Sequence, residues 1–199
     1  MKANLYLILS MIVFLTACKS ENDSADQTEE SKVATILPTG IPFAELGQSM
    51  ELLSQTVPNP ETFADSLQAD GGFAWWVRAL PYEGGNIFFE GEFIDERNYS
   101  EEKLYSSKVN RIRIETPALA TEEGIHIGST FKKLMEVKGD KTLTPTPIPS
   151  LGYLDVEDEA GHIHYLFKLD QEVFQNILEQ ANLLSVIPEE TPVSMIVIM

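Results

Sequence analysis

Two stretches of the chain occur twice, in the same order, and this repetition limits the folds open to it. Residues 46–53 (LGQSMELL) match residues 127–134 (IGSTFKKL) as an apolar residue, glycine, a polar residue, Ser or Thr, an apolar residue, two variable positions and leucine. Residues 109–114 (VNRIRI) match residues 193–198 (VSMIVI). The first pair is 81 positions apart and the second 84, so the offsets agree within a loop length. The shared order predicts two degenerate copies of one module.

Each predicted module, 36–116 and 117–199, starts with a short helix. Ser49 and Thr130 are placed to cap these helices, because their hydroxyls can accept hydrogen bonds from early helical N–H groups. Helices placed before runs of antiparallel strands predict an α+β fold, with helices on one face of each sheet. The predicted strands are Phe73–Leu80, Ile87–Ile94, Lys108–Glu115, Gly152–Glu157, Ile163–Leu169 and Val193–Met199.

Three other segments complete the predicted fold. Residues 59–67 predict a short helix, because Pro60 stands at the favoured first helical position. The proline-rich residues 144–150 predict an irregular surface loop. Residues 170–182 predict a helix that begins at a capping aspartate and carries an apolar stripe.

The start of the chain has the features of a secretory signal peptide. Lys2 provides a positive charge, residues 5–15 are apolar, and small residues precede Cys18, the single cysteine. We therefore predict a signal segment at residues 1–17. The apolar run is about half of the roughly 20 residues that a transmembrane helix needs, so we do not expect it to span a membrane.

Leu15-Thr16-Ala17-Cys18 resembles the lipobox of bacterial lipoproteins. The resemblance implies a diacylglycerol on the Cys18 thiol, a further acyl chain on the new N-terminus, no other cofactor, and stable membrane attachment. Lys19 implies the outer membrane, because aspartate at that position favours inner-membrane retention in enterobacterial lipoproteins. Residues 18–35 are polar and acidic and predict a flexible tether. An ordinary secretory signal with an incidental cysteine is the alternative interpretation.

Acidic side chains outnumber basic ones by 31 to 14. This excess argues against nucleic acid or anionic lipid as a partner, because both attract Lys and Arg. Solubility at a crowded envelope surface explains the excess, with cation binding as the alternative. If Cys18 carries lipid, no thiol is left for a disulfide, a zinc site or a nucleophile.

Residues 124–130 (GIHIGST) have features of an anion-binding loop, because glycines before a helix can present N–H groups to phosphate. A P-loop requires G-x-x-x-x-G-K-[ST], whereas here the lysine is absent and the spacing is shorter. The matching residues 46–53 keep only one glycine. We therefore interpret the segment as a structural turn followed by a helix cap.

Two histidines, two residues apart on a predicted strand, are expected on one face, where nearby carboxylates could complete a metal site. Residues 155–161 do not fit the calcium-loop pattern, and polar residues on a solvated strand explain the same sequence. A cleft that joined His126 to these groups would favour catalysis instead. The candidate metal ligands are His162, His164, Asp155 and Glu157.

Trp75 and Trp76 are adjacent on a predicted strand, so their side chains are expected on opposite faces of the sheet. If helices cover one face, one tryptophan lies in the core and the other at the surface, with Arg78 beside it. Exposed tryptophan and arginine are typical of protein-interface hot spots. Trp75, Trp76 and Arg78 therefore form the candidate interaction surface, unless the other module covers it.

The segment TEEGIHIGSTFKKLMEVKGD, with IRIE before it, resembles a pattern in uncharacterised small lipoproteins of Bacteroidetes-type bacteria. Two copies of a helix followed by an antiparallel sheet are more distantly similar to the tandem fold of β-lactamase-inhibitor protein and to small outer-membrane assembly lipoproteins. Those families bind proteins, so the resemblance implies protein binding. No binding residue of theirs can be assigned to this chain.

No Ser-His-acid arrangement with a local signature is present in the sequence. We predict a lipid-anchored, non-catalytic envelope protein that binds a protein or ligand at a sheet face or module junction. A periplasmic hydrolase without a recognisable motif and a divalent-cation-binding protein are the alternatives. The sequence does not define the oligomeric state.

Overall fold

A computed structural model describes residues 34–98, 100–178 and 183–199 of the chain. The predicted signal segment, Cys18 and nearly all of the predicted tether lie outside these residues. Within the described part, no helix is both long enough and apolar enough to cross a bilayer.

The described residues form one compact unit built from short helices and runs of strands. The described α-helices are α1 (Met50–Thr56), α2 (Glu101–Ser106), α3 (Phe131–Lys138) and α4 (Gln171–Leu178). The described strands are β1 (Ala34–Ile36), β2 (Gly40–Ile41), β3 (Ala44–Glu45), β4 (Ala64–Asp70), β5 (Phe73–Tyr82), β6 (Gly85–Gly91), β7 (Ile94–Asp95), β8 (Val109–Ile114), β9 (Leu119–Thr121), β10 (Leu143–Ile148), β11 (Tyr153–Asp158), β12 (Ile163–Lys168) and β13 (Val193–Ile198).

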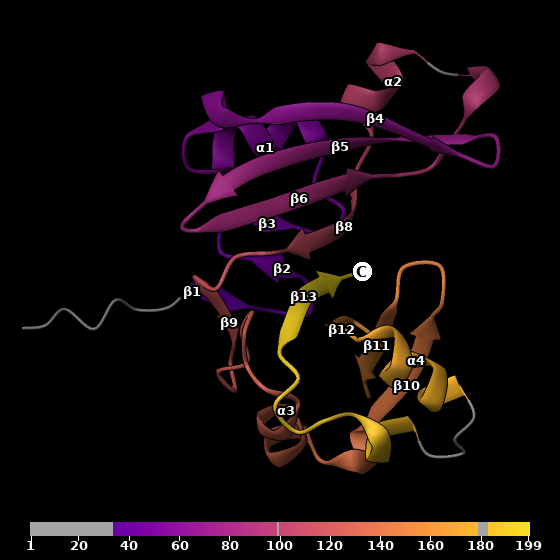
Figure 1. The fold of residues 1–199 in the computed structure, drawn as a ribbon. Helices are drawn as coiled ribbons and strands as arrows, with labels where there is room; N and C mark the ends of the chain where they lie inside the picture. Colours follow the sequence, from indigo (N-terminus) through magenta and orange to yellow (C-terminus); the bar gives the residue numbers. More distant parts are fainter. Residues whose placement is uncertain (1–33, 99, 179–182) are drawn as a thin grey trace, which may run out of the picture. The chain divides into compact units, whose positions relative to one another are not determined.

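One antiparallel sheet contains most of the strands (Figure 1). Eight of its nine strands follow the order β10-β11-β12-β13-β8-β6-β5-β4. The ninth, β7, pairs with β5 beside this path. A short hairpin of β2 and β3 and a parallel pair of β1 and β9 lie outside the sheet. The predicted α+β fold class is therefore confirmed.

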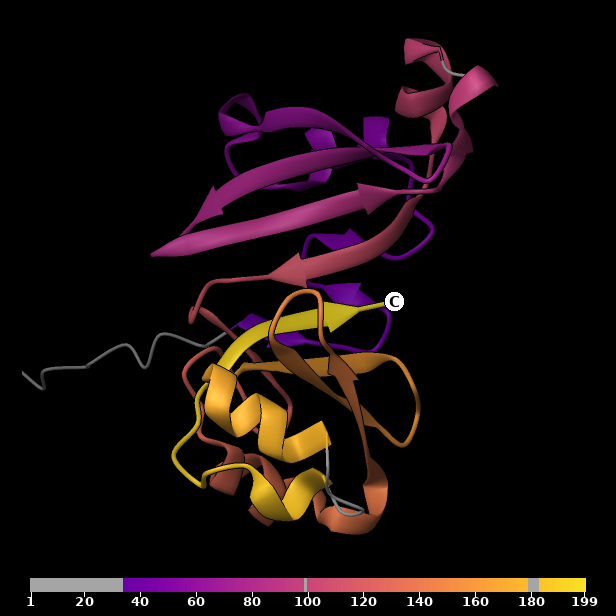
Figure 2. The same cartoon turned by 45° about the vertical axis from the view of Figure 1, so that its right-hand side comes forward.

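The strand order is symmetric about its centre, where the last strands of the two halves, β8 and β13, pair (Figure 2). Ile112 faces Ile198 and Ile114 faces Ile196, on either side of the pair between Arg113 and Val197. Each of these residues in β8 is 84 positions from its counterpart in β13, so a local two-fold axis through the central pair relates these two strands. From the centre outward, the strand order is β8, β6, β5 and β4 on one side and β13, β12, β11 and β10 on the other.

The predicted helix caps are confirmed at equivalent positions in both halves. The Ser49 hydroxyl accepts a hydrogen bond from the Leu52 N–H at 3.2 Å, at the start of α1. The Thr130 hydroxyl accepts one from the Lys133 N–H at 3.2 Å, at the start of α3. Each cap satisfies a helical N–H group that has no partner within the helix.

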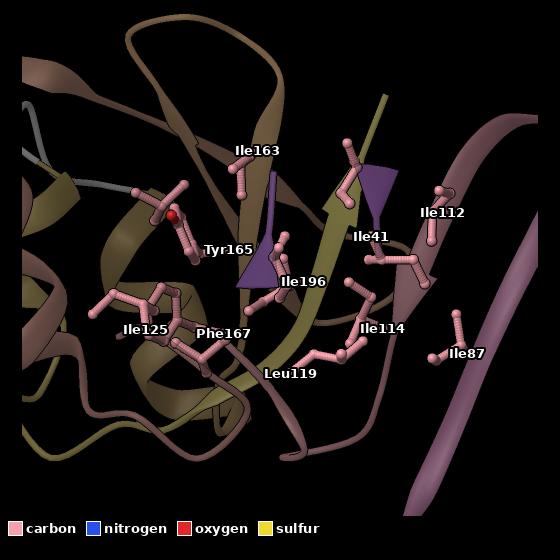
Figure 3. Packing of buried hydrophobic residues seen from close by; sticks show 14 of the residues in the cluster. Ile41, Ile87, Ile112, Ile114, Leu119, Ile125, Ile163, Tyr165, Phe167 and Ile196 are labelled. Carbon is pink, nitrogen blue, oxygen red and sulfur yellow. The ribbon is translucent and has the colours of Figure 1, made fainter. Parts of the chain in front are cut away.

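A single hydrophobic core extends through both halves (Figure 3). Ile112 and Ile114 of β8 meet Ile196 of β13 in this core, and Phe89 and Phe167 from the neighbouring strands are fully buried. The predicted modules, 36–116 and 117–199, thus share one sheet and one core. Their derivation from one repeated unit stays a prediction.

The two edge strands are where the sequence prediction was wrong. Pro60 begins only a single turn of 3₁₀ helix, and β4 replaces the rest of the helix predicted over residues 59–67. The second edge strand, β10, replaces most of the loop predicted over residues 144–150. All seven residues of β4 are exposed, so no buried alternation marks it, and proline is tolerated in β10 because edge strands need fewer N–H donors.

Candidate functional site

Trp75 lies on the face of the sheet opposite α1 and α3, in the strand β5. Side chains alternate along β5, so Phe73, Trp75 and Val77 share this opposite face, whereas Trp76 and Arg78 point toward the helices. The register with β6 and β8 places Glu90 and Arg111 on the same opposite face. The opposite face therefore combines aromatic and charged side chains.

Three aromatic rings are in contact on this face. Phe93 lies with its ring centroid 5.1 Å from that of Trp75 and 6.5 Å from that of Phe73, in edge-to-face geometry. Phe73 is 53% exposed and Phe93 is 56% exposed, whereas Trp75 is half-buried. We call Phe73, Trp75 and Phe93 the aromatic cluster. More than half of each phenylalanine remains in water, where burial against a partner would be favourable.

Two adjoining hollows flank the aromatic cluster. The first, of about 550 Å³, is lined by the cluster together with Asp70, Gly71 and Arg111. The second, of about 300 Å³, adds Glu90, Asn110 and Met199 to Trp75, Phe93 and Arg111. Because Trp75, Phe93 and Arg111 line both hollows, a bound chain that filled them would contact all three.

A larger hollow of about 740 Å³ lies between the β2–β3 hairpin and α1. Its walls include the repeated turn Leu46-Gly47-Gln48, and Phe43 beside it packs on Tyr82 at 5.4 Å. The two smaller hollows differ from it because they adjoin the exposed rings of Phe73 and Phe93.

A buried carboxylate holds the arginines beside the aromatic cluster in place. Glu90 accepts a hydrogen bond from Arg111 Nε at 2.9 Å, and Arg113 Nε lies 3.5 Å from its other oxygen. Arg113 also packs over the Phe88 ring at 3.9 Å and approaches Glu115 at 3.3 Å. The positive charges are thus largely compensated, and Arg111 offers the hollows a fixed, flat guanidinium.

Trp76 does not belong to this surface. Its side chain is half-buried against the core on the helix-bearing face, and its ring lies 5.2 Å from Tyr105 of α2. The prediction that the paired tryptophans face opposite sides is therefore confirmed, and Trp75 is the one beside the hollows.

Arg78 was predicted to contribute to the interaction surface, and this is wrong because it is only 8% exposed. It forms an ion pair with Asp65 of β4 at 2.8 Å and donates to the Met50 carbonyl at 2.9 Å and the Ser54 hydroxyl at 3.0 Å. Its guanidinium also lies 4.3 Å from the Phe63 ring centroid. Arg78 therefore fastens α1 to the sheet.

The glycine-containing turn before α3 uses its N–H groups within the protein. Gly128 donates to the Val193 carbonyl at 2.9 Å and Ser129 to the His126 carbonyl at 2.9 Å. Phe131 donates to the Thr191 carbonyl, in the loop before β13, at 2.8 Å. The matching turn before α1 repeats the first bond, between Gly47 and the Val109 carbonyl at 2.8 Å. These bonds support the structural interpretation, since they occupy the N–H groups that an anion would need.

The four candidate metal ligands do not form one cluster. His162 and His164 were expected on one strand face, and this is wrong because β12 begins at Ile163 and His162 lies in the preceding turn, exposed. His164 is buried, and Glu157 is its neighbour across the strands. Among the described residues, no three His, Cys, Asp or Glu side chains are placed to hold a metal ion.

His164 instead forms an ion pair with Asp155. Its Nδ1 lies 3.0 Å from a carboxylate oxygen, and this hydrogen bond raises the pKa of His164 despite the opposing effect of burial. A cleft joining His126 to these groups would have favoured catalysis. The His126 Nδ1 instead lies 2.8 Å from the Ile127 carbonyl. Both histidines are therefore engaged in local contacts.

Sequence reasoning found one of the three rings in the aromatic cluster. Phe73 carries a signal that was available, because it is two residues from Trp75 on the same predicted strand and so shares its face. Phe93 carries no such signal, because it follows the end of β6 and its position depends on the pairing of β7 with β5. Arg111 is likewise placed by strand register.

Comparison with known proteins gives a fold likeness and no family. No family model matches the chain. No curated protein matches it either. A crystal structure of the uncharacterized protein yfeY from Escherichia coli is similar to it, with a TM-score of 0.54 and 12% sequence identity over 82% of this chain and 98% of that one. At this identity the likeness shows a shared fold alone.

Proposed function

We propose that this protein is a lipid-anchored, non-catalytic binding protein of the cell envelope, which holds an apolar segment of a partner protein at the aromatic cluster. The observation that carries the proposal is the pair of exposed rings, Phe73 and Phe93, packed around Trp75 between two hollows. Interface hot spots combine such aromatic anchors with arginine, which Arg111 supplies here.

The anchor supports this function by restricting the partner to one compartment. The resemblance of residues 15–18 to a lipobox implies lipid on Cys18. The predicted tether would then hold the folded unit at a mean distance of roughly 20–25 Å from the membrane, and it is two residues shorter than predicted because residues 34 and 35 belong to β1. The partner is therefore an envelope protein, and the proposed location is the outer membrane.

Replacing Phe73 and Phe93 together with serine is expected to abolish partner binding at the aromatic cluster. Truncating one hot-spot residue commonly costs about 2 kcal/mol, which is a roughly 30-fold loss of affinity, and losing both residues should exceed that loss. The measurement is the yield of a photo-crosslinker placed at Asn110, which lines the smaller hollow, in intact cells. The double variant should lose the cross-link to a second envelope protein.

Leu151→Ser is the matched control, because Leu151 is 61% exposed and lies in a turn of the second half. It should leave the cross-link unchanged. A cross-link that survives the double substitution, or one that joins two copies of this chain, contradicts the proposed site.

Replacing Cys18 with serine is expected to move the protein from the membrane fraction to the soluble envelope fraction, because serine has no thiol to accept the diacylglycerol. Incorporation of labelled fatty acid should disappear as well, whereas Ser20→Ala should keep both properties. A Cys18→Ser protein that still requires detergent for extraction would show that the anchor lies elsewhere.

A further inference from the structure

The two edges of the large sheet are protected to different degrees. At one end, β10 contains Pro145 and Pro147, and proline on an edge strand removes N–H donors that another strand would need. At the other end, β4 contains neither proline nor a basic residue. Its pairing with β5 runs without a bulge over all seven residues, and Figure 1 shows it as the outermost strand.

The turn between β4 and β5 shows which backbone groups face outward. Gly71 and Gly72, both with positive φ, form a two-residue loop closed by Asp70 and Phe73. In such hairpins the closing pair is hydrogen-bonded, so alternate residues of β4 bond to β5 and the others point away. The outward residues are Asp65, Leu67 and Ala69, each with one N–H and one C=O at the open edge.

The charge of the chain indicates which kind of strand could bind at the open edge of β4. Asp70 carries the charge that β4 can offer, because the other charged residue of the strand, Asp65, is paired with Arg78. The chain as a whole carries 31 acidic against 14 basic side chains. A second copy carries the same strong negative charge as the first, so electrostatic repulsion opposes pairing β4 with β4. A strand that carries Lys or Arg would be attracted instead.

We propose that the open edge of β4 binds an extended, basic segment of a partner protein, which adds to the sheet as a further strand. The outward N–H and C=O groups supply the affinity of strand addition, and Asp70 together with the acidic chain around it selects the charge of the partner. The new strand would lie on the side of β4 away from β5, which carries Phe73 and Trp75. The site shares only Asp70 with the first hollow beside the aromatic cluster.

The test uses the full-length chain in detergent and a fluorescent, capped seven-residue peptide of valine and threonine with a lysine at each end. We expect saturable binding by fluorescence anisotropy. Methylating the peptide nitrogens on one edge should abolish it, because those nitrogens can no longer donate to β4. Glutamate in place of both lysines should weaken binding at least tenfold.

Leu67→Pro is the matching change in the protein. It removes the central outward N–H and leaves the bonds to β5 in place, so affinity should fall at least tenfold. Leu67→Thr keeps that N–H and should bind as the natural chain does. The methylated peptide gives the same information without relying on the proline variant to fold.

Three outcomes would overturn the proposal: no saturable binding, equal binding of the glutamate peptide, or a dimer of the natural chain that Leu67→Pro dissolves. The last would place a second copy at the edge. Phe73→Ser with Phe93→Ser should leave peptide binding unchanged, so failure of the aromatic cluster as a site and failure of the β4 edge can be told apart.

Discussion

Replacing Arg78 with methionine is expected to lower the free energy of unfolding by about 1–3 kcal/mol, the usual effect of leaving hydrogen-bonding groups without their partner. The guanidinium is held by Asp65, the Met50 carbonyl and the Ser54 hydroxyl, all within 3.0 Å. Methionine fills similar space but leaves the carboxylate and the carbonyl without this donor. Each kcal/mol lowers the melting temperature of a domain of this size by roughly 2–4 °C, so thermal unfolding measures the effect.

Arg97→Met is the control for this substitution. Arg97 also pairs with an aspartate, Asp95, at 2.9 Å, but its side chain is 89% exposed and solvent competes for the charge. Its removal should leave the melting temperature unchanged. If Arg78→Met melts at the same temperature as Arg97→Met, the Arg78–Asp65 pair does not fasten α1 to the sheet.

Leu53→Ala and Leu134→Ala are each expected to lower the free energy of unfolding by about 2–5 kcal/mol, because each deletes buried methyl groups and leaves a cavity. The two leucines occupy equivalent places in α1 and α3, and both are 0% exposed. They belong to one core that spans the central pair of β8 and β13. Each variant should therefore unfold in a single transition, measured in urea by circular dichroism and by tryptophan fluorescence.

The fluorescence probe makes this experiment informative, because both tryptophans lie in the first half of the chain. Leu134→Ala, in the second half, should shift the fluorescence and circular dichroism curves together. If it shifts circular dichroism alone, the modules unfold independently. The exposed Leu151→Ala serves as the control and should shift neither curve measurably.

The inner strands could be predicted from the sequence, whereas the edges of the sheet could not. For β5, β8, β11, β12 and β13, the predicted bounds agree closely with the observed ones because turn residues bound these segments. The edge strands β4 and β10 hold their places through neighbours on one side only. The exposed residues of β4 therefore follow Pro60 like the continuation of a helix, and the prolines of β10 make that strand resemble a loop.

For the candidate site, the sequence predicted which residues share a face of the sheet but not which face is covered. Adjacent strand residues must face opposite sides, so the separation of Trp75 from Trp76 follows from the chain alone. Whether a face is covered depends on which element packs against it. Arg78 lies on the same face as Trp76, where α1 covers it. An arginine that the sequence suggested as an interface residue therefore has a structural role.

The sequence by itself determined the repeated turn and helix cap at Ser49 and Thr130, because these features depend on hydrogen bonds between residues close in the chain. It also determined which strand residues share a face. Only the tertiary structure decided that β8 and β13 join the halves in one sheet and that Phe93 meets Trp75 and Phe73 at the surface. Those contacts depend on strand register and on packing between segments distant in the chain, which local sequence patterns do not specify.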